Sequence, residues 1–108
     1  IIMMDINFFE SKINIDIKIY RGSNIVIAYK NKTLYEGLRN DCLNKIMQTV
    51  NDLPSIGEKE ITFNILNMTV GDAAHEDDKI FFKNKLNLLG NSVRCKIKVN
   101  AGLYNLYA

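Results

Sequence analysis

The sequence predicts an α+β protein in which an antiparallel-rich mixed sheet packs against two helices as a two-layer sandwich. Two observations carry this prediction: apolar residues alternate at period two in several segments, and helical spacing replaces that period in two others. The predicted order is β-β-β-α-β-α-β within one domain, residues 1–108. An additional N-terminal strand is left open, because apolar residues also alternate across residues 2–8. Two helices cover one face of such a sheet and leave the other face open.

The first three predicted strands form a β-meander. Residues 13–20 are the clearest strand, because four isoleucines alternate there with polar residues, which gives one buried and one solvated face. A short turn separates this strand from a second one over residues 25–30. We expect Asn31 and Lys32 to form a two-residue turn that leads into a short third strand, residues 33–36.

The first predicted helix spans residues 38–52. Its apolar side chains recur at every fourth position, namely Leu38, Cys42, Ile46 and Val50. This spacing places them on one face of a helix, with polar residues elsewhere on its surface. A proline two residues beyond the last predicted helical position ends the helix, because the residue before proline is driven out of helical geometry.

A fourth strand, a second helix and a fifth strand complete the prediction. Residues 60–66 and 92–100 alternate apolar with polar side chains and therefore indicate strands. Residues 73–89 carry a helical apolar stripe. Asp72 is a suitable N-cap for this helix, and Gly90 suits the position just after its end.

Composition excludes several protein classes. The net charge of +2 is too small to indicate a nucleic-acid or membrane partner, and no stretch approaches the ~18 apolar residues of a membrane span. The sequence shows no targeting segment, so we expect a cytoplasmic or otherwise intracellular protein. Cys42 and Cys95 both fall at apolar positions, as buried thiols in a reducing compartment do; a bridge between them is left open.

The first functional hypothesis is a non-catalytic protein-interaction module: a small inhibitor, subunit or adaptor, of the kind found in viruses and mobile elements. An open sheet face and an edge strand recruit partners through main-chain hydrogen bonds. The C-terminal tail adds Tyr104, Leu106 and Tyr107, residues of the kind that anchor interfaces. The expected partner is another protein or a second copy of this chain.

The second hypothesis is a nucleic-acid-binding domain. Lys18, Arg94, Lys96 and Lys98 alternate with apolar residues, which places them on the open sheet face, with Tyr20 nearby. Basic side chains beside an aromatic on a sheet are typical of single-stranded nucleic-acid platforms. Alternating lysines on an edge strand also protect against aggregation, so this signal alone does not decide the function.

The third hypothesis is a divalent-metal nuclease. The predicted element order resembles the start of the ribonuclease H-like fold, and the resemblance implies carboxylates on the first strand, the first helix and the end of the fourth strand, converging on metal. Asp16, Asp41 and Asp72 are the acids nearest these places. Each also has an ordinary local role, as a solvated strand position, a polar helix position or a helix cap. No catalytic residue is therefore assigned.

No cofactor or metal site is predicted. His75 is the only histidine, and on a helix it shares a side with Asp72 and Glu76. One histidine with two flexible carboxylates makes an incomplete metal site. The six glycines never form a phosphate-binding spacing, and no hydrolase motif is present, so an enzyme is not favoured.

Overall fold

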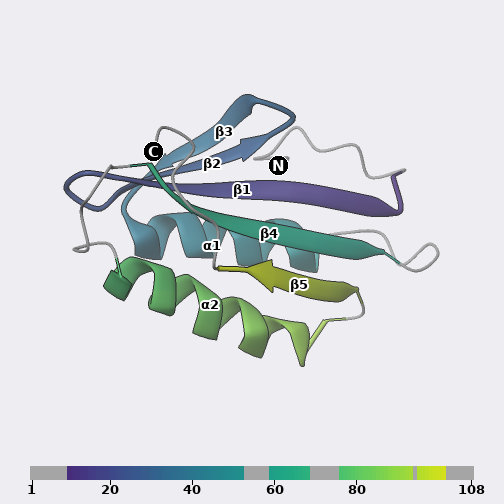
Figure 1. Ribbon diagram of the computed structural model, residues 1–108. Coiled ribbons are helices and arrows are strands. Elements are labelled where there is room, and N and C mark those ends of the chain that lie inside the picture. Colours follow the sequence, from purple (N-terminus) through teal and green to yellow (C-terminus); the bar gives the residue numbers. More distant parts are fainter. Residues whose placement is uncertain (1–9, 53–58, 69–75, 94, 102–108) are drawn as a thin grey trace.

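The computed structural model describes residues 10–52, 59–68, 76–93 and 95–101. These residues form a five-stranded mixed sheet with the strand order β3-β2-β1-β4-β5. Helices α1 and α2 lie side by side on one face of this sheet (Figure 1). The predicted two-layer α+β architecture is confirmed.

The elements follow the predicted order along the chain. The strands are β1 (Lys12–Tyr20), β2 (Asn24–Tyr29), β3 (Lys32–Gly37), β4 (Glu60–Asn67) and β5 (Lys96–Asn100), and the helices are α1 (Arg39–Asn51) and α2 (Glu76–Gly90). The additional N-terminal strand and the C-terminal tail of the sequence prediction lie outside the described residues.

Strand β1 is the centre of the sheet. It pairs antiparallel with β2 and parallel with β4, and β4 in turn pairs parallel with β5. Parallel neighbours need a crossover connection, which α2 provides between β4 and β5. As a consequence, β1, β4 and β5 all begin at the same end of the sheet (Figure 1).

The apolar residues that alternate at period two in the sequence form the core. The isoleucines of β1 are at most 2% exposed, and Ile15 pairs with the fully buried Phe63 of β4. Helix α1 contributes Ile46 to the same cluster, and helix α2 contributes Phe82 and Leu86. These side chains fill the space between the sheet and the helices, so burial of apolar surface fixes which face of the sheet the helices cover.

The turn between β2 and β3 lies one residue earlier than predicted. Tyr29 pairs with Lys32, so the two-residue loop is Lys30 and Asn31, both with positive φ (50° and 64°). Two successive positive φ values are those of a type I′ turn, whose twist matches the flanking strands. The register also shifts between Ile27 and Ala28, a β-bulge that the alternation did not predict.

The last strand is shorter than predicted. Residues 91 and 92 form tight turns in which Asn91 N–H donates to the Leu88 carbonyl and Ser92 N–H to the Leu89 carbonyl, at 3.1 and 3.0 Å. These bonds continue the end of α2 rather than start a strand, and β5 begins only at Lys96. Gly90 is the last residue of α2 and does not have a positive φ, so it does not fill the predicted position after the helix.

The face of the sheet away from the helices, here called the far face, is not uniformly solvated. On the helix-free side of β2 and β4, Ala28 is 2% and Leu66 is 5% exposed. Across β5, the far-face residues Lys96, Lys98 and Asn100 are all exposed. The predicted polar face is therefore interrupted by these two buried apolar residues, although polar side chains occupy it along β1 and β5.

Candidate functional site

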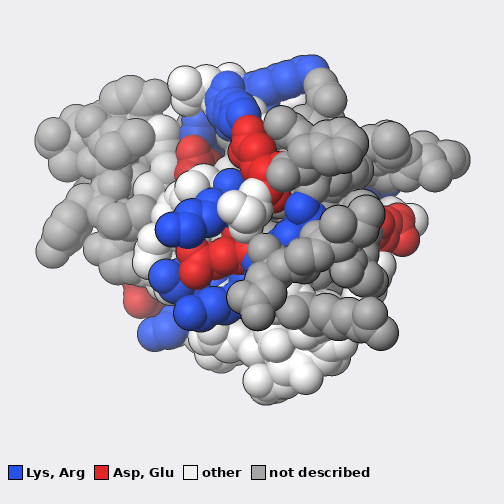
Figure 2. Space-filling model, turned by 90° about the vertical axis from the view of Figure 1, so that its right-hand side faces the viewer, with Lys and Arg blue, Asp and Glu red and all other residues white. Residues whose placement is uncertain are grey.

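Lysines gather at the end of the sheet where β1, β4 and β5 begin. We call this region the lysine end and define it by Lys12, Lys30, Lys32, Lys59, Lys96 and Lys98 together with Glu10 and Glu60. The parallel pairing brings three strand starts together, and the β2–β3 turn lies at the same end. Figure 2 shows this side of the molecule, where basic and acidic side chains are interleaved.

Glu10 connects the β2–β3 turn to the start of β4. Its carboxylate accepts a hydrogen bond from the Tyr29 hydroxyl at 3.1 Å and forms an ion pair with Lys30. Its backbone carbonyl accepts a hydrogen bond from Lys59 Nζ at 3.1 Å. The hydrogen bond to Glu10 raises the pKa of Lys30 above its usual value, because it stabilises the charged ammonium form.

Glu60 lies among three other lysines. In the sheet register it pairs with Lys12 of β1 on one side and with Lys96 of β5 on the other. Lys98, two residues further along β5, forms an ion pair with the Glu60 carboxylate at 3.3 Å. Lys12 and Lys96 are exposed, and neither has a side-chain ion pair with another described residue.

The charge of the molecule is unevenly distributed. The described residues of the lysine end, six lysines and two glutamates, sum to a formal charge of +4, whereas the whole chain carries +2 and its other residues therefore sum to −2. The low overall charge therefore conceals a basic region. Local charge density, rather than net charge, determines the electrostatic potential that an approaching ligand meets.

The structure brings together two of the four basic residues predicted to bind nucleic acid. Lys96 and Lys98 belong to the lysine end, and Arg94 lies outside the described residues. Lys18 pairs with Leu66 of β4, four residues further along the strand than the partner of Lys98. That offset is about 13 Å, so Lys18 does not join the cluster.

Sequence reasoning missed the other four lysines of the region, which are Lys12, Lys30, Lys32 and Lys59. Each of them lies at or beside the first or last residue of a strand. Lysines at strand boundaries were a signal in the sequence. Their convergence depended on which strands run parallel, and alternation alone does not determine that.

The acids of the nuclease hypothesis lie on different sides of the sheet. Asp16 accepts a hydrogen bond from Asn64 Nδ2 at 3.1 Å, and Asn64 Oδ1 accepts one from Asn100 at 2.9 Å, which forms a polar ladder across the far face. Asp41 is exposed on α1, which packs on the opposite face. Asp72 lies outside the described residues, and no group of three potential metal ligands occurs among the residues that are described.

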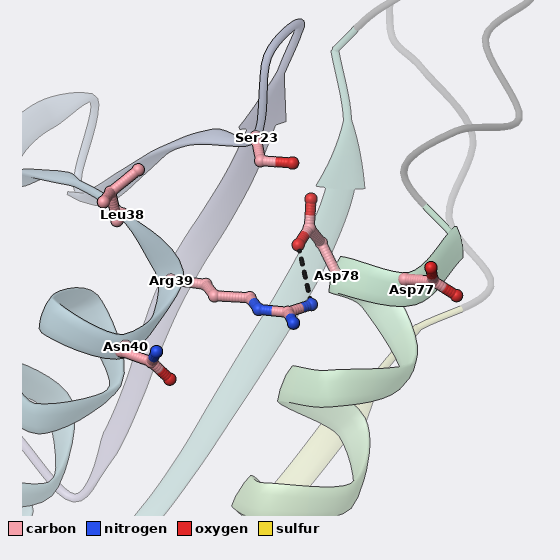
Figure 3. Close-up of a pocket in the computed structure, with 6 residues that line it drawn as sticks. All are labelled: Ser23, Leu38, Arg39, Asn40, Asp77 and Asp78. Atoms are coloured by element: carbon pink, nitrogen blue, oxygen red, sulfur yellow. Dashed lines mark hydrogen bonds and ion pairs between the residues drawn. The ribbon is translucent and has the colours of Figure 1, made fainter.

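A second feature, a cavity of about 400 Å³, lies at the opposite end of the sheet from the lysines. Figure 3 shows the six side chains that line it: Ser23, Leu38, Arg39, Asn40, Asp77 and Asp78. They come from the β1–β2 turn and from the first turns of both helices.

An ion pair closes one side of this cavity. Arg39 Nη1 donates to Asp78 Oδ1 at 3.1 Å, with the aspartate side chain 4% and the arginine side chain 40% exposed. The Arg39 guanidinium also stacks on the Phe81 ring at 4.7 Å from its centre. These contacts join α1 to α2, and the two charges neutralise each other, so we interpret this cavity as structural.

Neither described cysteine is an activated nucleophile. Cys42 is fully buried, with Sγ at 3.7 Å from the carbonyls of Ile25 and Gly37. Burial raises the pKa of its thiol to about 11. Cys95 is half-buried, burial likewise raises its pKa, and both thiols are free. A catalytic cysteine needs the opposite shift, toward the thiolate.

The remaining predicted site residues lie outside the described residues. His75 and the tail residues Tyr104, Leu106 and Tyr107 are in this group, so the role of the tail stays a prediction. Among the described residues, no helix is both long and apolar enough to cross a membrane. The sequence matches no protein-family model, and searches of curated proteins and of solved structures found no match.

Proposed function

We propose that this protein is a non-catalytic, intracellular binding module whose lysine end holds a polyanion of the nucleic-acid class. The observation that carries the proposal is the convergence of six lysines from four separate segments, against two carboxylates among the residues that the structure describes there. Phosphate backbones are bound chiefly by such clusters of ammonium groups, and neutralised phosphates release counterions that drive association. The proposal takes up the nucleic-acid hypothesis of the sequence analysis with a changed set of residues, in which Lys96 and Lys98 are kept and four other lysines are added.

A polyanion fits this surface better than a single small anion does. The lysines are spread across the starts of three strands and the neighbouring turn, so they face an extended ligand rather than one enclosed ion. They are also largely exposed, with the side chains of Lys30 and Lys98 60% and 53% exposed. A site for one small anion is ordinarily concave and encloses its ligand.

Two double variants of equal charge test the proposal. Lys96→Gln/Lys98→Gln removes two cations from the lysine end. Lys83→Gln/Lys85→Gln removes two exposed cations from α2, on the helix layer. We expect wild type and the α2 variant to be retained on duplex DNA, single-stranded RNA and heparin at low salt, and the β5 variant to bind at least about tenfold more weakly.

Three results would overturn the proposal. One is the absence of retention of the wild-type protein on any of the three polyanions at low salt. Another is an equal loss in both double variants, which would show that only net charge matters. The third is a loss confined to the α2 variant. Thermal melting of each variant confirms that the compared proteins are folded.

A protein partner or a second copy of this chain is the second candidate. The observation that favours it is that β3 and β5 are the edge strands of the described sheet, and an edge strand can pair with a strand of a partner through main-chain hydrogen bonds. Sedimentation analysis over a hundredfold range of protein concentration tests for a second copy. A concentration-dependent dimer that persists in Lys96→Gln/Lys98→Gln, without retention on polyanions, would favour this candidate.

A further inference from the structure

We infer that Glu60 acts as an internal competitor for the bound polyanion, an inference that rests on the proposed function of the lysine end. In the free protein its carboxylate holds Lys98 in an ion pair at 3.3 Å. A phosphate that engages Lys98 must displace this carboxylate. Glu60 therefore limits affinity and sets the strength of polyanion that the site retains.

The sheet register places Glu60 at the centre of its cluster. Lys12 and Lys96 are its direct neighbours on β1 and β5, and Lys98 lies one side-chain repeat further along the same face. Neighbouring strands are about 4.8 Å apart, so Lys12 and Lys96 branch from positions about that far from Glu60 on the same face of the sheet. Any phosphate that contacts these lysines also approaches the charge of Glu60.

The ion pair is weak enough to be displaced. The Glu60 side chain is 23% and the Lys98 side chain 53% exposed, so solvent screens the attraction. Such partly exposed pairs contribute little to stability. A polyanion presents many phosphates to several lysines at once, and counterion release adds to its advantage over a single carboxylate. Removal of the carboxylate charge is therefore expected to strengthen binding rather than weaken it.

The obvious alternative is that Glu60 positions Lys98 for its ligand. The two roles predict opposite signs. If Glu60 competes, its neutral isostere frees Lys98 and raises affinity. If Glu60 positions Lys98, the same substitution leaves that lysine disordered and lowers affinity. A single measurement of sign therefore distinguishes them.

The test compares Glu60→Gln with Glu36→Gln. Both variants raise the net charge by one, but Glu36 is in β3 near its far end, where it accepts a hydrogen bond from Asn24 at 2.8 Å. We expect Glu60→Gln to bind duplex DNA about two- to fivefold more tightly than Glu36→Gln, the range of an exposed ion pair. A plot of log affinity against log salt concentration should have a slope steeper by about 0.9 for Glu60→Gln than for Glu36→Gln, since one more phosphate is neutralised.

A double-variant cycle tests the mechanism. In the Lys98→Gln background the gain from Glu60→Gln should shrink, because the freed lysine is no longer present. If the wild type binds but Glu60→Gln binds no better than Glu36→Gln, this inference is wrong while the proposed function survives. If the wild type binds no polyanion, the proposed function fails and this inference fails with it. Should Glu60→Gln not fold, Glu60→Thr makes the same comparison with a residue suited to strands.

Discussion

The two ends of the sheet use opposite charges in different ways. At the end with the cavity, Arg39 and Asp78 form a pair in which the carboxylate is almost fully buried, and the partners come from different helices. At the lysine end, the described lysines outnumber the described carboxylates, and five of the six lysines are exposed. A balanced, buried pair holds elements together, whereas an exposed excess of one sign remains available to a ligand. The same chain therefore separates a structural use of charge from a binding use.

The largest expected effect is the dependence of polyanion affinity on salt concentration, which tests whether the lysine end is a binding surface. The excess of four positive charges among the described residues of the lysine end corresponds to about four phosphate contacts. Affinity for duplex DNA should then fall roughly a hundredfold between 50 and 200 mM salt. Fluorescence anisotropy with a labelled duplex measures it. Over the same range the free energy of unfolding should change little, since the carboxylate of the Arg39–Asp78 pair is almost fully buried. A salt-independent affinity would contradict the assignment of the lysine end.

The next effect concerns the end with the cavity. Arg39→Met keeps an apolar stem against Phe81 but leaves the buried Asp78 carboxylate without this cation. We expect a loss of about 2 kcal/mol in the free energy of unfolding, below the 3–5 kcal/mol of fully buried pairs because Arg39 is partly exposed. Urea denaturation measures this loss.

Lys79→Met is the matched control for that variant. Lys79 pairs with Glu76 at 3.5 Å within α2, and the glutamate is well exposed. Removal of a cation from such a pair should cost less than about 0.5 kcal/mol. Equal losses in the two variants would show that burial does not distinguish the pairs. Polyanion binding should stay at the wild-type level in both variants, because both cations lie outside the lysine end.

The fold was predictable because short stretches of the sequence are enough to show which residues are buried. The four isoleucines of β1 specify a strand and its buried face without knowledge of any partner. The first helix was predicted to within one residue at each end, because its apolar spacing and the following proline act locally. The prediction placed the β2–β3 turn one residue too late. Lys30 adopts a positive φ, and a lysine side chain does not indicate that conformation.

The lysine end was not predictable in the same way. Lys12, Lys59 and Lys96 are far apart in the chain and meet only because β1, β4 and β5 run parallel in adjacent positions. The spacing of apolar residues identifies the strands and their buried faces, but it does not show which strands are adjacent in the sheet. Prediction of a common face therefore grouped Lys18 with Lys98, whereas the register separates them along β4. A site built by topology becomes visible only once the strand order is known.

The smallest expected effect concerns Cys42, in the first turns of α1. Burial raises the pKa of its thiol from 9.0 to about 11, so between these values the unfolded chain loses a proton that the folded protein retains. A group with a raised folded pKa stabilises fully below its unfolded pKa and loses that contribution as pH rises. By pH 10 the loss should be about 1.4 kcal/mol relative to pH 8.

Cys42→Ala provides the reference for this measurement. It is expected to be less stable at every pH, because it leaves a small cavity, but to lack this part of the alkaline decline. Contributions from every other group are common to both proteins and cancel in the comparison. Urea denaturation at pH 8, 9 and 10 therefore isolates the thiol. Parallel declines in the two proteins would show that Cys42 ionises in the folded state as easily as in the unfolded chain, and that the packing at the start of α1 admits water.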